Sequence, residues 1–301
     1  MKTATTPAPA KTTNNALSWF LITILTLIWG TSFILMKKGL VVFSAGEVGG
    51  LRMAIASLAL LPFAVRQVSR MEPGRWKYIA GSGMLGNFLP AFLFAYAETR
   101  LASGLAGVLN SLTALFTLLM GAIFFRQSIT WMRMLGIVVG IAGTAVLIFS
   151  GNGSTDLDNK YYGIYIVLAT VCYGASVNII KHRLQGIKPL VISSLALLTV
   201  GPLALGYLFT TNVVGKLQHT PGAWEAFSYI AILAIVSTAI ALVLFNKLIH
   251  ISTTLFASSI TYLIPIVALL WGVLDGERIQ LWHYAGMLVI LAGVFIVNRA
   301  K

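Results

Sequence analysis

Residues 17–36 read LSWFLITILTLIWGTSFILM, an apolar run without a single charged side chain. An α-helix rises 1.5 Å per residue, so about 20 apolar residues cross roughly 30 Å of hydrocarbon. The run therefore predicts a helix that spans a membrane. Lys37 and Lys38 follow it, and it lacks a persuasive small-residue cleavage site, which argues against a cleaved signal peptide.

Nine further stretches meet or approach the same length. The ten predicted spans are 17–36, 48–65, 77–97, 102–125, 132–150, 161–180, 190–210, 225–246, 252–273 and 280–298. Most links between them are short and contain turn formers or charges. The strands of a membrane β-barrel would be much shorter and polar at every second residue. We therefore expect an all-α integral membrane protein.

The composition points to the same class. Of 301 residues, 58% are hydrophobic and 10% charged, whereas about a quarter of the residues in a soluble domain are charged. The only cysteine is Cys172, so the chain can form neither an intrachain disulfide nor a cysteine metal cluster. The four histidines show no ligand spacing, and the acids Asp156 and Asp158 are expected to be solvated. We expect no metal and no cofactor.

The chain has a net charge of +13, and its basic residues are distributed as the predicted topology requires. With ten helices, both termini and the even-numbered loops share one side, which holds 14 of the 21 basic residues and only Glu72 of the eight carboxylates. Basic residues concentrate in cytoplasmic loops. We therefore expect cytoplasmic termini in a bacterial inner membrane, with loop 152–159 outside. The bilayer and a small-molecule substrate are the expected partners, and a nucleic-acid partner loses its support.

The sequence contains an internal repeat. Residues 29–37 (WGTSFILMK) match 173–181 (YGASVNIIK) at an offset of 144, and 135–143 (LGIVVGIAG) match 285–293 (AGMLVILAG) at an offset of 150. Each half then holds five helices, and an odd number of crossings inverts the second half relative to the first. The expected units are a disordered cytoplasmic tail at 1–16 and two repeats at 17–150 and 151–301.

The chain resembles the EamA-type members of the drug and metabolite transporter superfamily. The resemblance rests on residues 28–33 (IWGTSF), 51–53 (LRM), 265–271 (PIVALLW), Gly276-Glu277-Arg278, Trp282, Gly286 and 291–293 (LAG). It covers nearly the whole chain after the tail. It implies a central cavity between the two halves that opens alternately to each side, with the fifth and tenth helices at the periphery.

The first half departs from this pattern at two places. It has Arg126-Gln127 where the second half has Gly276-Glu277, and Leu115 where the second half has Pro265. Any function of those family residues would therefore rest on the second half alone.

Four asparagines lie within predicted helices, where lipid offers an amide no hydrogen-bond partner: Asn87, Asn110, Asn178 and Asn246. They either line the substrate cavity or bond between helices, an interaction worth about 1 kcal/mol. We favour the cavity for Asn110 and Asn246, because the third, fourth, eighth and ninth helices are central in the resembling family.

Four aromatic residues lie deep in the predicted spans and are further cavity candidates: Trp29, Tyr96, Tyr173 and Tyr262. Packing is the usual role of such side chains. Trp29 and Tyr173 are repeat-related, and each precedes glycine and small polar residues. Such a sequence can leave backbone carbonyls accessible near the membrane centre, as substrate sites require.

Two charged residues are candidates for gating or for contact with substrate charge. Arg52 lies about one turn into the second helix, where it either contacts an anion, pairs with Glu47 or another outer carboxylate, or extends to the interface. Glu98 lies at the outer end of the third helix and is the carboxylate nearest to a membrane interior.

Small residues form faces on the fifth and tenth helices: Gly136, Gly140, Gly143, Gly286 and Gly293. Such faces allow close approach of two helices. They serve either packing within the chain or contact in a homodimer.

The expected function is transport of a small metabolite, such as an amino acid, by an exporter, uniporter or exchanger. No Asp or Glu falls in the middle of a predicted helix, and proton-coupled carriers commonly use such a group. Proton-coupled antiport is therefore the alternative. An intramembrane enzyme is disfavoured, because G-x-S-x-G, H-E-x-x-H and a suitable Cys/His pair are absent from the sequence.

Overall fold

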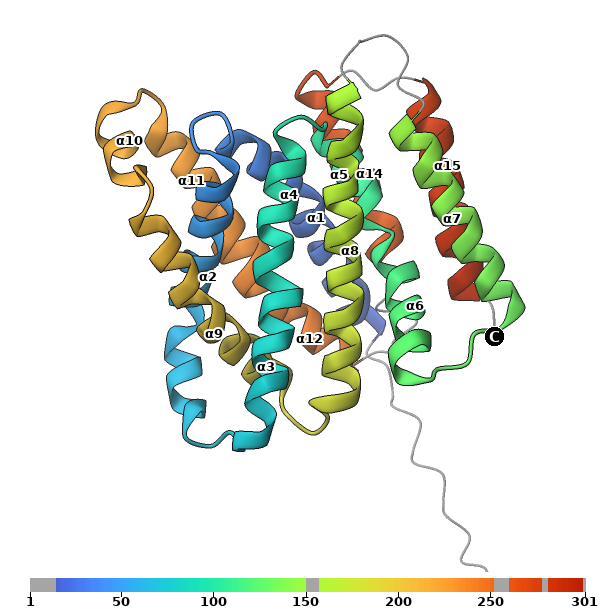
Figure 1. Ribbon diagram of the computed structural model, residues 1–301, viewed down its shortest axis with the longest axis horizontal. Coiled ribbons are helices and arrows are strands. Elements are labelled where there is room, and N and C mark those ends of the chain that lie inside the picture. The colour runs from blue at the N-terminus through green and yellow to red at the C-terminus, as the bar shows by residue number, and fades with distance from the viewer. Residues whose placement is uncertain (1–14, 150–156, 252–259, 278–280, 300–301) are drawn as a thin grey trace, which may run out of the picture.

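The computed structural model describes residues 15–149, 157–251, 260–277 and 281–299, and every regular element in these ranges is helical (Figure 1). The first half contains α1 (Asn15–Gly39), α2 (Ala45–Val68), η1 (Pro73–Arg75), α3 (Trp76–Gly83), η2 (Met84–Phe88), α4 (Leu89–Glu98), α5 (Ser103–Asn110), α6 (Thr113–Phe125) and α7 (Trp131–Phe149). The second contains α8 (Leu157–Arg183), α9 (Pro189–Phe209), α10 (Val213–His219), α11 (Ala223–Ala234), η3 (Ile235–Ile240), α12 (Ala241–Ile251), α14 (Ile260–Leu274) and α15 (Leu281–Arg299).

Eight helical stretches among the described residues are long and apolar enough to cross a membrane, and two shorter apolar helices, Ile260–Leu274 and Leu281–Val297, join them. The predicted all-α membrane fold of about ten helices is confirmed. The predicted span 252–273 is described only from Ile260 onward. Residues 1–14 and most of the predicted outer loop 152–159 lie outside the described residues.

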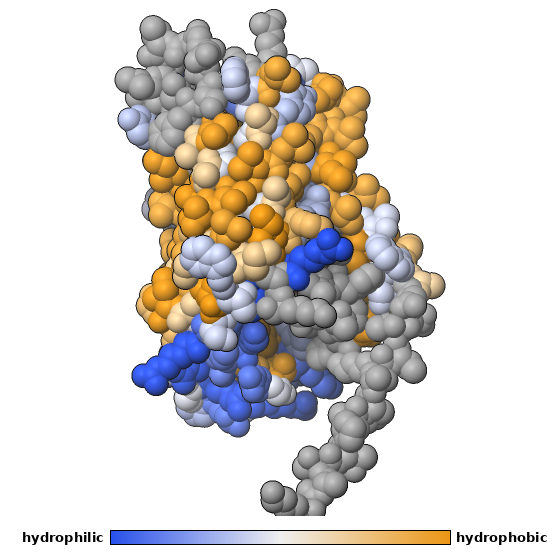
Figure 2. All heavy atoms as spheres, turned by 90° about the vertical axis from the view of Figure 1, so that its right-hand side faces the viewer, coloured by the Kyte–Doolittle hydropathy of each residue, from blue (hydrophilic) through white to orange (hydrophobic). Residues whose placement is uncertain are grey.

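The outer surface is apolar, as contact with lipid requires. Large side chains such as Phe124 and Leu274 are 69% and 76% exposed. Figure 2 shows the face formed by α7 and α15, where apolar residues cover the middle and upper part and hydrophilic residues gather at the bottom. Exposed apolar area of this extent indicates burial in a non-aqueous environment. "Upper" and "lower" below refer to the orientation of Figure 1.

Two of the predicted spans are interrupted by π-helical segments. The third span consists of α3, η2 and α4, and Pro90, the second residue of α4, lacks the N–H that a continuous α-helix would need. The eighth consists of α11, η3 and α12, and the Thr238 hydroxyl donates to the Leu233 carbonyl, five residues earlier, at 3.2 Å. Since Ile235 follows Met84 by 151 positions, the two segments occupy corresponding places in the repeats.

Two further differences from the predicted spans are local. The fourth span bends at Ser111 and Leu112, between α5 and α6. A short helix, α10, occupies part of the link predicted between the seventh and eighth spans.

Helix contacts between the halves come in matching pairs. Helix α1 of the first half packs on α14, α11 and α12 of the second half. Its repeat counterpart α8 packs on α6, α3 and α4 of the first half. Glycines allow both crossings: a Cβ on Gly30 would lie 2.5 Å from the Val267 Cβ, and one on Gly174 would lie 2.7 Å from the Phe116 carbonyl carbon. The glycines of the repeated motif therefore serve close packing of helices.

The small-residue faces of α7 and α15 pack against each other within the chain, at one edge of the bundle (Figure 1). A Cβ on Gly293 would lie 2.5 Å from the Gly140 backbone nitrogen and 2.6 Å from the Gly136 carbonyl oxygen. These faces therefore serve packing within the chain. A homodimer remains a prediction and would use another surface.

Candidate functional site

The interior site is centred on the π segment η3, which receives two side chains from the first half. The Trp29 indole Nε1 donates to the Ser237 carbonyl at 3.0 Å, and the Arg52 Nε donates to the Thr238 hydroxyl at 3.1 Å. Ser237 in turn donates to the Ile28 carbonyl at 3.2 Å. A π segment shifts the backbone hydrogen-bond pattern of a helix and is frequent at functional sites. Here it holds α1 and α2 against the eighth span.

Aromatic rings surround this point. Trp29 contacts Phe245 edge-on, with ring centroids 5.1 Å apart, and Tyr173 lies against Phe94 at 6.1 Å. Trp29, Arg52 and Tyr173 are all half-buried. Arg52 interacts electrostatically with Tyr173 and with Glu98.

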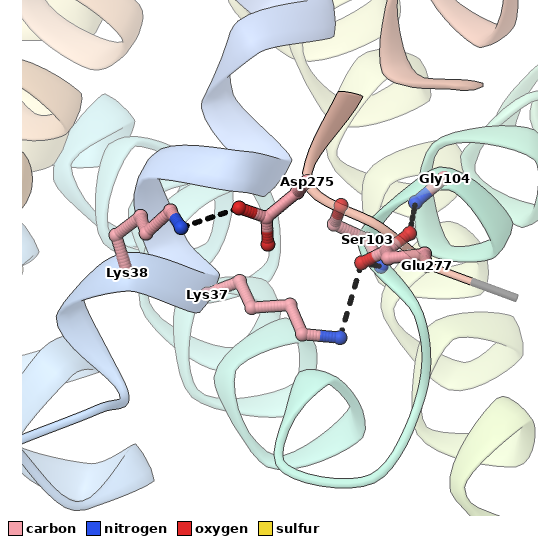
Figure 3. A network of polar contacts seen from close by, with 6 residues as sticks. All are labelled: Lys37, Lys38, Ser103, Gly104, Asp275 and Glu277. Atoms are coloured by element: carbon pink, nitrogen blue, oxygen red, sulfur yellow. Dashed lines mark hydrogen bonds and ion pairs between the residues drawn. The ribbon is translucent and has the colours of Figure 1, made fainter. Parts of the chain in front are cut away.

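At the upper end, charged groups tie three helices together, as Figure 3 shows. Lys37 of α1 pairs with Glu277 at 3.0 Å, and Lys38 pairs with Asp275. The Glu277 carboxylate also accepts hydrogen bonds from the first backbone amides of α5, at 2.7 and 3.1 Å. We call this group the upper clamp; its members are Lys37, Lys38, Asp275, Glu277 and the amides of Ser103 and Gly104.

The local sequence explains why Glu277 reaches this position. Gly276 adopts a left-handed φ of +79° that ends α14 and turns the chain. A side chain at Gly272 would collide with the Glu277 carboxylate. The free amides and the dipole at the start of α5 favour a negative charge. Burial would raise the pKa of Glu277, but the hydrogen bonds from Gly104, Ser103 and Lys37 outweigh it and hold the pKa below its ordinary value.

The corresponding place in the first half carries a cluster of amide and imidazole side chains at the lower end. The Gln127 amide lies 2.8 Å from His182 Nε2 and donates to the Asn178 oxygen at 3.3 Å. Asn178 donates to the carbonyls of Thr117 and Gly174 at 2.7 and 2.8 Å. We call Gln127, Asn178 and His182 the lower cluster. Gln127 is the repeat counterpart of Glu277, so the two halves close their ends with different chemistry.

The remaining upper-end ion pair anchors α10. Lys216 pairs with Glu47 at 2.6 Å, and Glu47 also accepts from the Ser44 backbone amide at 2.7 Å, which completes a capping box on α2. Glu47 is therefore the partner of Lys216, and Arg52 does not form the expected pair with it.

Of the other candidate residues, three make structural contacts. Asn178 is buried and bridges α8 to α6 through its hydrogen bonds. The Tyr262 hydroxyl donates to the Val294 carbonyl at 2.8 Å, which ties α14 to the peripheral α15. Tyr96 is 47% exposed and its ring lies 6.2 Å from that of Tyr165.

The other asparagines differ from Asn178. Asn87 is half-buried in η2. Asn110 is half-buried at the end of α5, and its side chain makes no hydrogen bond within the described residues. Asn246 belongs to α12, but its side chain lies outside the described part of the chain. Asn110 therefore keeps hydrogen-bonding capacity for water or a substrate.

Sequence reasoning did not select the upper clamp or Gln127 as functional. The signal was present, because Glu277 belongs to the family pattern and Arg126-Gln127 marks the departure from it. What was missing was the spatial neighbourhood of these residues. Among the described residues, no group of three or more His, Cys, Asp or Glu side chains could hold a metal ion.

The chain matches the model of the EamA-like transporter family twice, over residues 17–149 and 161–299. It is 25% identical to a "Probable amino-acid metabolite efflux pump" of Salmonella typhimurium over 92% of this chain and 93% of that protein. It is 24% identical to the "Uncharacterized inner membrane transporter YedA" of Escherichia coli K12, over 92% and 89%. A crystal structure at 19% identity shares the fold, with a TM-score of 0.57 and coverage of 93% and 96%.

Proposed function

Because this chain belongs to the EamA-like transporter family, we propose that it moves a small metabolite such as an amino acid out of the cell, as an exporter, uniporter or exchanger working by alternating access. It is an integral inner-membrane transporter and not an enzyme. The substrate class is supported by the name of the efflux-pump relative from Salmonella typhimurium.

The observation that carries the proposed mechanism is the pair of end closures. The upper clamp joins α1, α5 and the end of α14. The lower cluster joins α8 to the end of α6 at the corresponding place of the other half. Alternating access requires one closure at each end, broken in turn while the other holds. Two repeat-related closures on opposite ends of the bundle fit this requirement.

The test is efflux from proteoliposomes that contain the purified full chain and are loaded with the twenty isotopically labelled amino acids. We expect a subset of them to leave faster than from protein-free liposomes, measured by mass spectrometry of the external buffer. A second set, with an imposed pH gradient, tests proton-coupled antiport, which predicts that efflux follows the gradient. If no amino acid leaves faster, the proposed substrate class is wrong.

We propose that the upper end faces outward and that the termini are cytoplasmic, in keeping with the basic residues of the lower loops. Thr220 and Ser69 are exposed at opposite ends of the bundle. In a Cys172→Ser background, Thr220→Cys should react with a membrane-impermeant maleimide on intact cells. Ser69→Cys should react only after the membrane is opened. The reverse order would invert the orientation.

A further inference from the structure

The Glu98 carboxyl group has no hydrogen-bond partner within the described fold. Its side chain is buried at 2% exposure, and neither carboxylate oxygen has a hydrogen-bond partner among the described residues. It is also the last residue of α4, where the helix dipole disfavours a negative charge. A buried carboxylate without a partner is costly. A positively charged group from outside the described fold would supply the missing partner.

The two cationic side chains that interact electrostatically with Glu98 already have other partners. Lys37 of α1 and Arg52 of α2 attract it, and Glu277 at the end of α14 repels it. Lys37 contacts Glu277 directly, and the Arg52 Nε is held by Thr238. Neither forms an ion pair with Glu98 in the described structure.

Arg52 has the complementary unused capacity. Apart from the Nε bond to Thr238, its guanidinium makes no hydrogen bond or ion pair within the described residues. It is half-buried. The two terminal nitrogens of a guanidinium bind a carboxylate in a bidentate manner.

We propose that Arg52 and Glu98 bind the two charged ends of a zwitterionic substrate, with the α-carboxylate on Arg52 and the α-ammonium on Glu98. This inference rests on the proposed function and assigns its substrate contacts. The Arg52 Nε is bonded to Thr238 of η3, and the rest of the guanidinium and the Glu98 carboxyl group are the two contacts that we assign to the ligand. The contact between Arg52 and Thr238 also links the bound substrate to the second half.

Two families of derivatives separate the two contacts. Methyl esters of amino acids retain the ammonium and lose the carboxylate, whereas N-acetyl amino acids retain the carboxylate and lose the ammonium. Each is added as a competitor of amino-acid efflux in the proteoliposomes above. Removing one charge-assisted hydrogen bond should weaken binding by about 10- to 100-fold.

The expected pattern is crossed. Glu98→Gln should weaken competition by free amino acids and methyl esters but leave that of N-acetyl derivatives unchanged. Arg52→Gln should weaken free amino acids and N-acetyl derivatives but leave methyl esters unchanged. Glu72→Gln and Arg75→Gln, which remove an exposed ion pair at the lower end, serve as matched controls. If Arg52→Gln does not fold, Arg52→Lys keeps the charge without the bidentate geometry and should show a weaker version of its pattern.

Three results would overturn the inference. Equal loss for all derivatives in both variants would point to a structural role. An unchanged preference in Glu98→Gln would remove Glu98 from the site. If Glu98→Gln loses the response to a pH gradient but keeps the preference of the wild type among the derivatives, Glu98 transfers a proton instead of binding the substrate ammonium. If the wild type moves no amino acid, the proposed function fails, whereas efflux without the crossed pattern refutes only this inference.

Discussion

Asn110 and Asn178 are the same residue type in equally apolar helices, yet their amides have different surroundings. Asn178 bonds to two backbone carbonyls and to Gln127. Asn110 makes no hydrogen bond within the described residues and is half-buried. Sequence could identify both as groups that need a partner, because lipid offers none. It could not choose between them, because two partners of Asn178, the Thr117 carbonyl and Gln127, lie more than fifty residues away in the sequence.

Replacing each asparagine by leucine should therefore have opposite effects. Asn178→Leu removes the hydrogen bonds of Asn178 with the Thr117 carbonyl and with Gln127, and should cost about 1 to 3 kcal/mol of stability. Asn110→Leu should leave the melting temperature in detergent nearly unchanged but weaken apparent substrate affinity by about 5- to 150-fold. Melting temperature and efflux measured on the same two variants decide this. Reduced stability with normal affinity in Asn110→Leu would remove it from the site.

Glu277 gives a stability prediction that depends on pH. Its folded pKa lies below its ordinary value because the Gly104, Ser103 and Lys37 hydrogen bonds outweigh the effect of burial. A carboxyl with a depressed folded pKa contributes stability above its unfolded pKa and loses that contribution as pH falls through the folded pKa. The melting temperature of Glu277→Gln should therefore lie below that of the wild type near neutral pH.

The difference in melting temperature should shrink as the pH falls below about 4.3, the ordinary value for glutamate. Glu72→Gln is the control, because Glu72 forms an exposed ion pair worth at most about 1 kcal/mol. A difference between wild type and Glu277→Gln that stays constant down to the folded pKa would show that the charge of Glu277 does not stabilise the clamp.

The burial of Glu98 could not be predicted from the sequence. Its position at the end of a predicted helix suggested a boundary carboxylate, and the absence of acids in mid-helix favoured uncoupled transport. In the structure Glu98 is buried, and its charge interactions are with Lys37, Glu277 and Arg52. Glu277 lies more than 170 residues away in the sequence, and no local pattern reports such a neighbour.

At the scale of elements, hydrophobic length predicted the existence of the helices but not their interruptions. In the third span, Gly83, Gly86 and Pro90 gave a local reason for a break. The segment η3 contains neither glycine nor proline. It is held by contacts with Trp29 and Arg52 from the other half. A π segment that depends on such distant contacts cannot be read from its own residues.

The packing of α7 on α15 gives a prediction for one element pair. In Gly293→Ala the new methyl group would meet the Gly140 and Gly136 backbones at 2.5 to 2.7 Å, and backbone atoms cannot move aside individually. We expect a loss of about 1 to 3 kcal/mol, seen as a lower melting temperature. Gly206→Ala in α9 is the matched control, because a Cβ there meets nothing within 4 Å. Equal melting temperatures for the two variants would contradict tight packing at Gly293.

At the scale of the molecule, the repeat explains both the pairing of helices and the difference between the two ends. Gly121 and Gly272 occupy corresponding places, and a Cβ on either would collide with the side chain of Gln127 or Glu277 respectively. Arg126 holds the left-handed conformation, φ 52°, that Gly276 holds in the other half. The two halves therefore share the backbone conformation at this place. The side chain that follows is a carboxylate, Glu277, in the second half and an amide, Gln127, in the first. The exact boundaries of the repeats, 17–150 and 151–301, remain a prediction.

This asymmetry has a consequence for gating. The upper clamp depends on charge, so removing Lys37 should loosen the upper end while leaving the lower cluster intact. Ser103 is fully buried beneath the clamp, at 0% exposure, and its backbone amide, rather than its side chain, binds Glu277. Ser103→Cys in the Cys172→Ser background therefore reports opening without removing a clamp contact. With Lys37→Met added, its reaction with an impermeant maleimide should become about 2- to 5-fold faster, as loss of an ion pair worth up to about 1 kcal/mol requires.

The control for this prediction is Arg75→Met, which removes the exposed ion pair with Glu72 and the hydrogen bond to the Gln185 carbonyl at the lower end and should leave the reaction of Ser103→Cys unchanged. Thr220→Cys, exposed in α10's flanking turn, supplies the rate of an always accessible thiol. A Lys37 variant that reacts no faster than its parent would mean that the ion pair does not hold the upper end closed. Equal acceleration by both methionine variants would indicate general loosening of the bundle. A local gate at the upper end would respond only to the loss of the ion pair at that end.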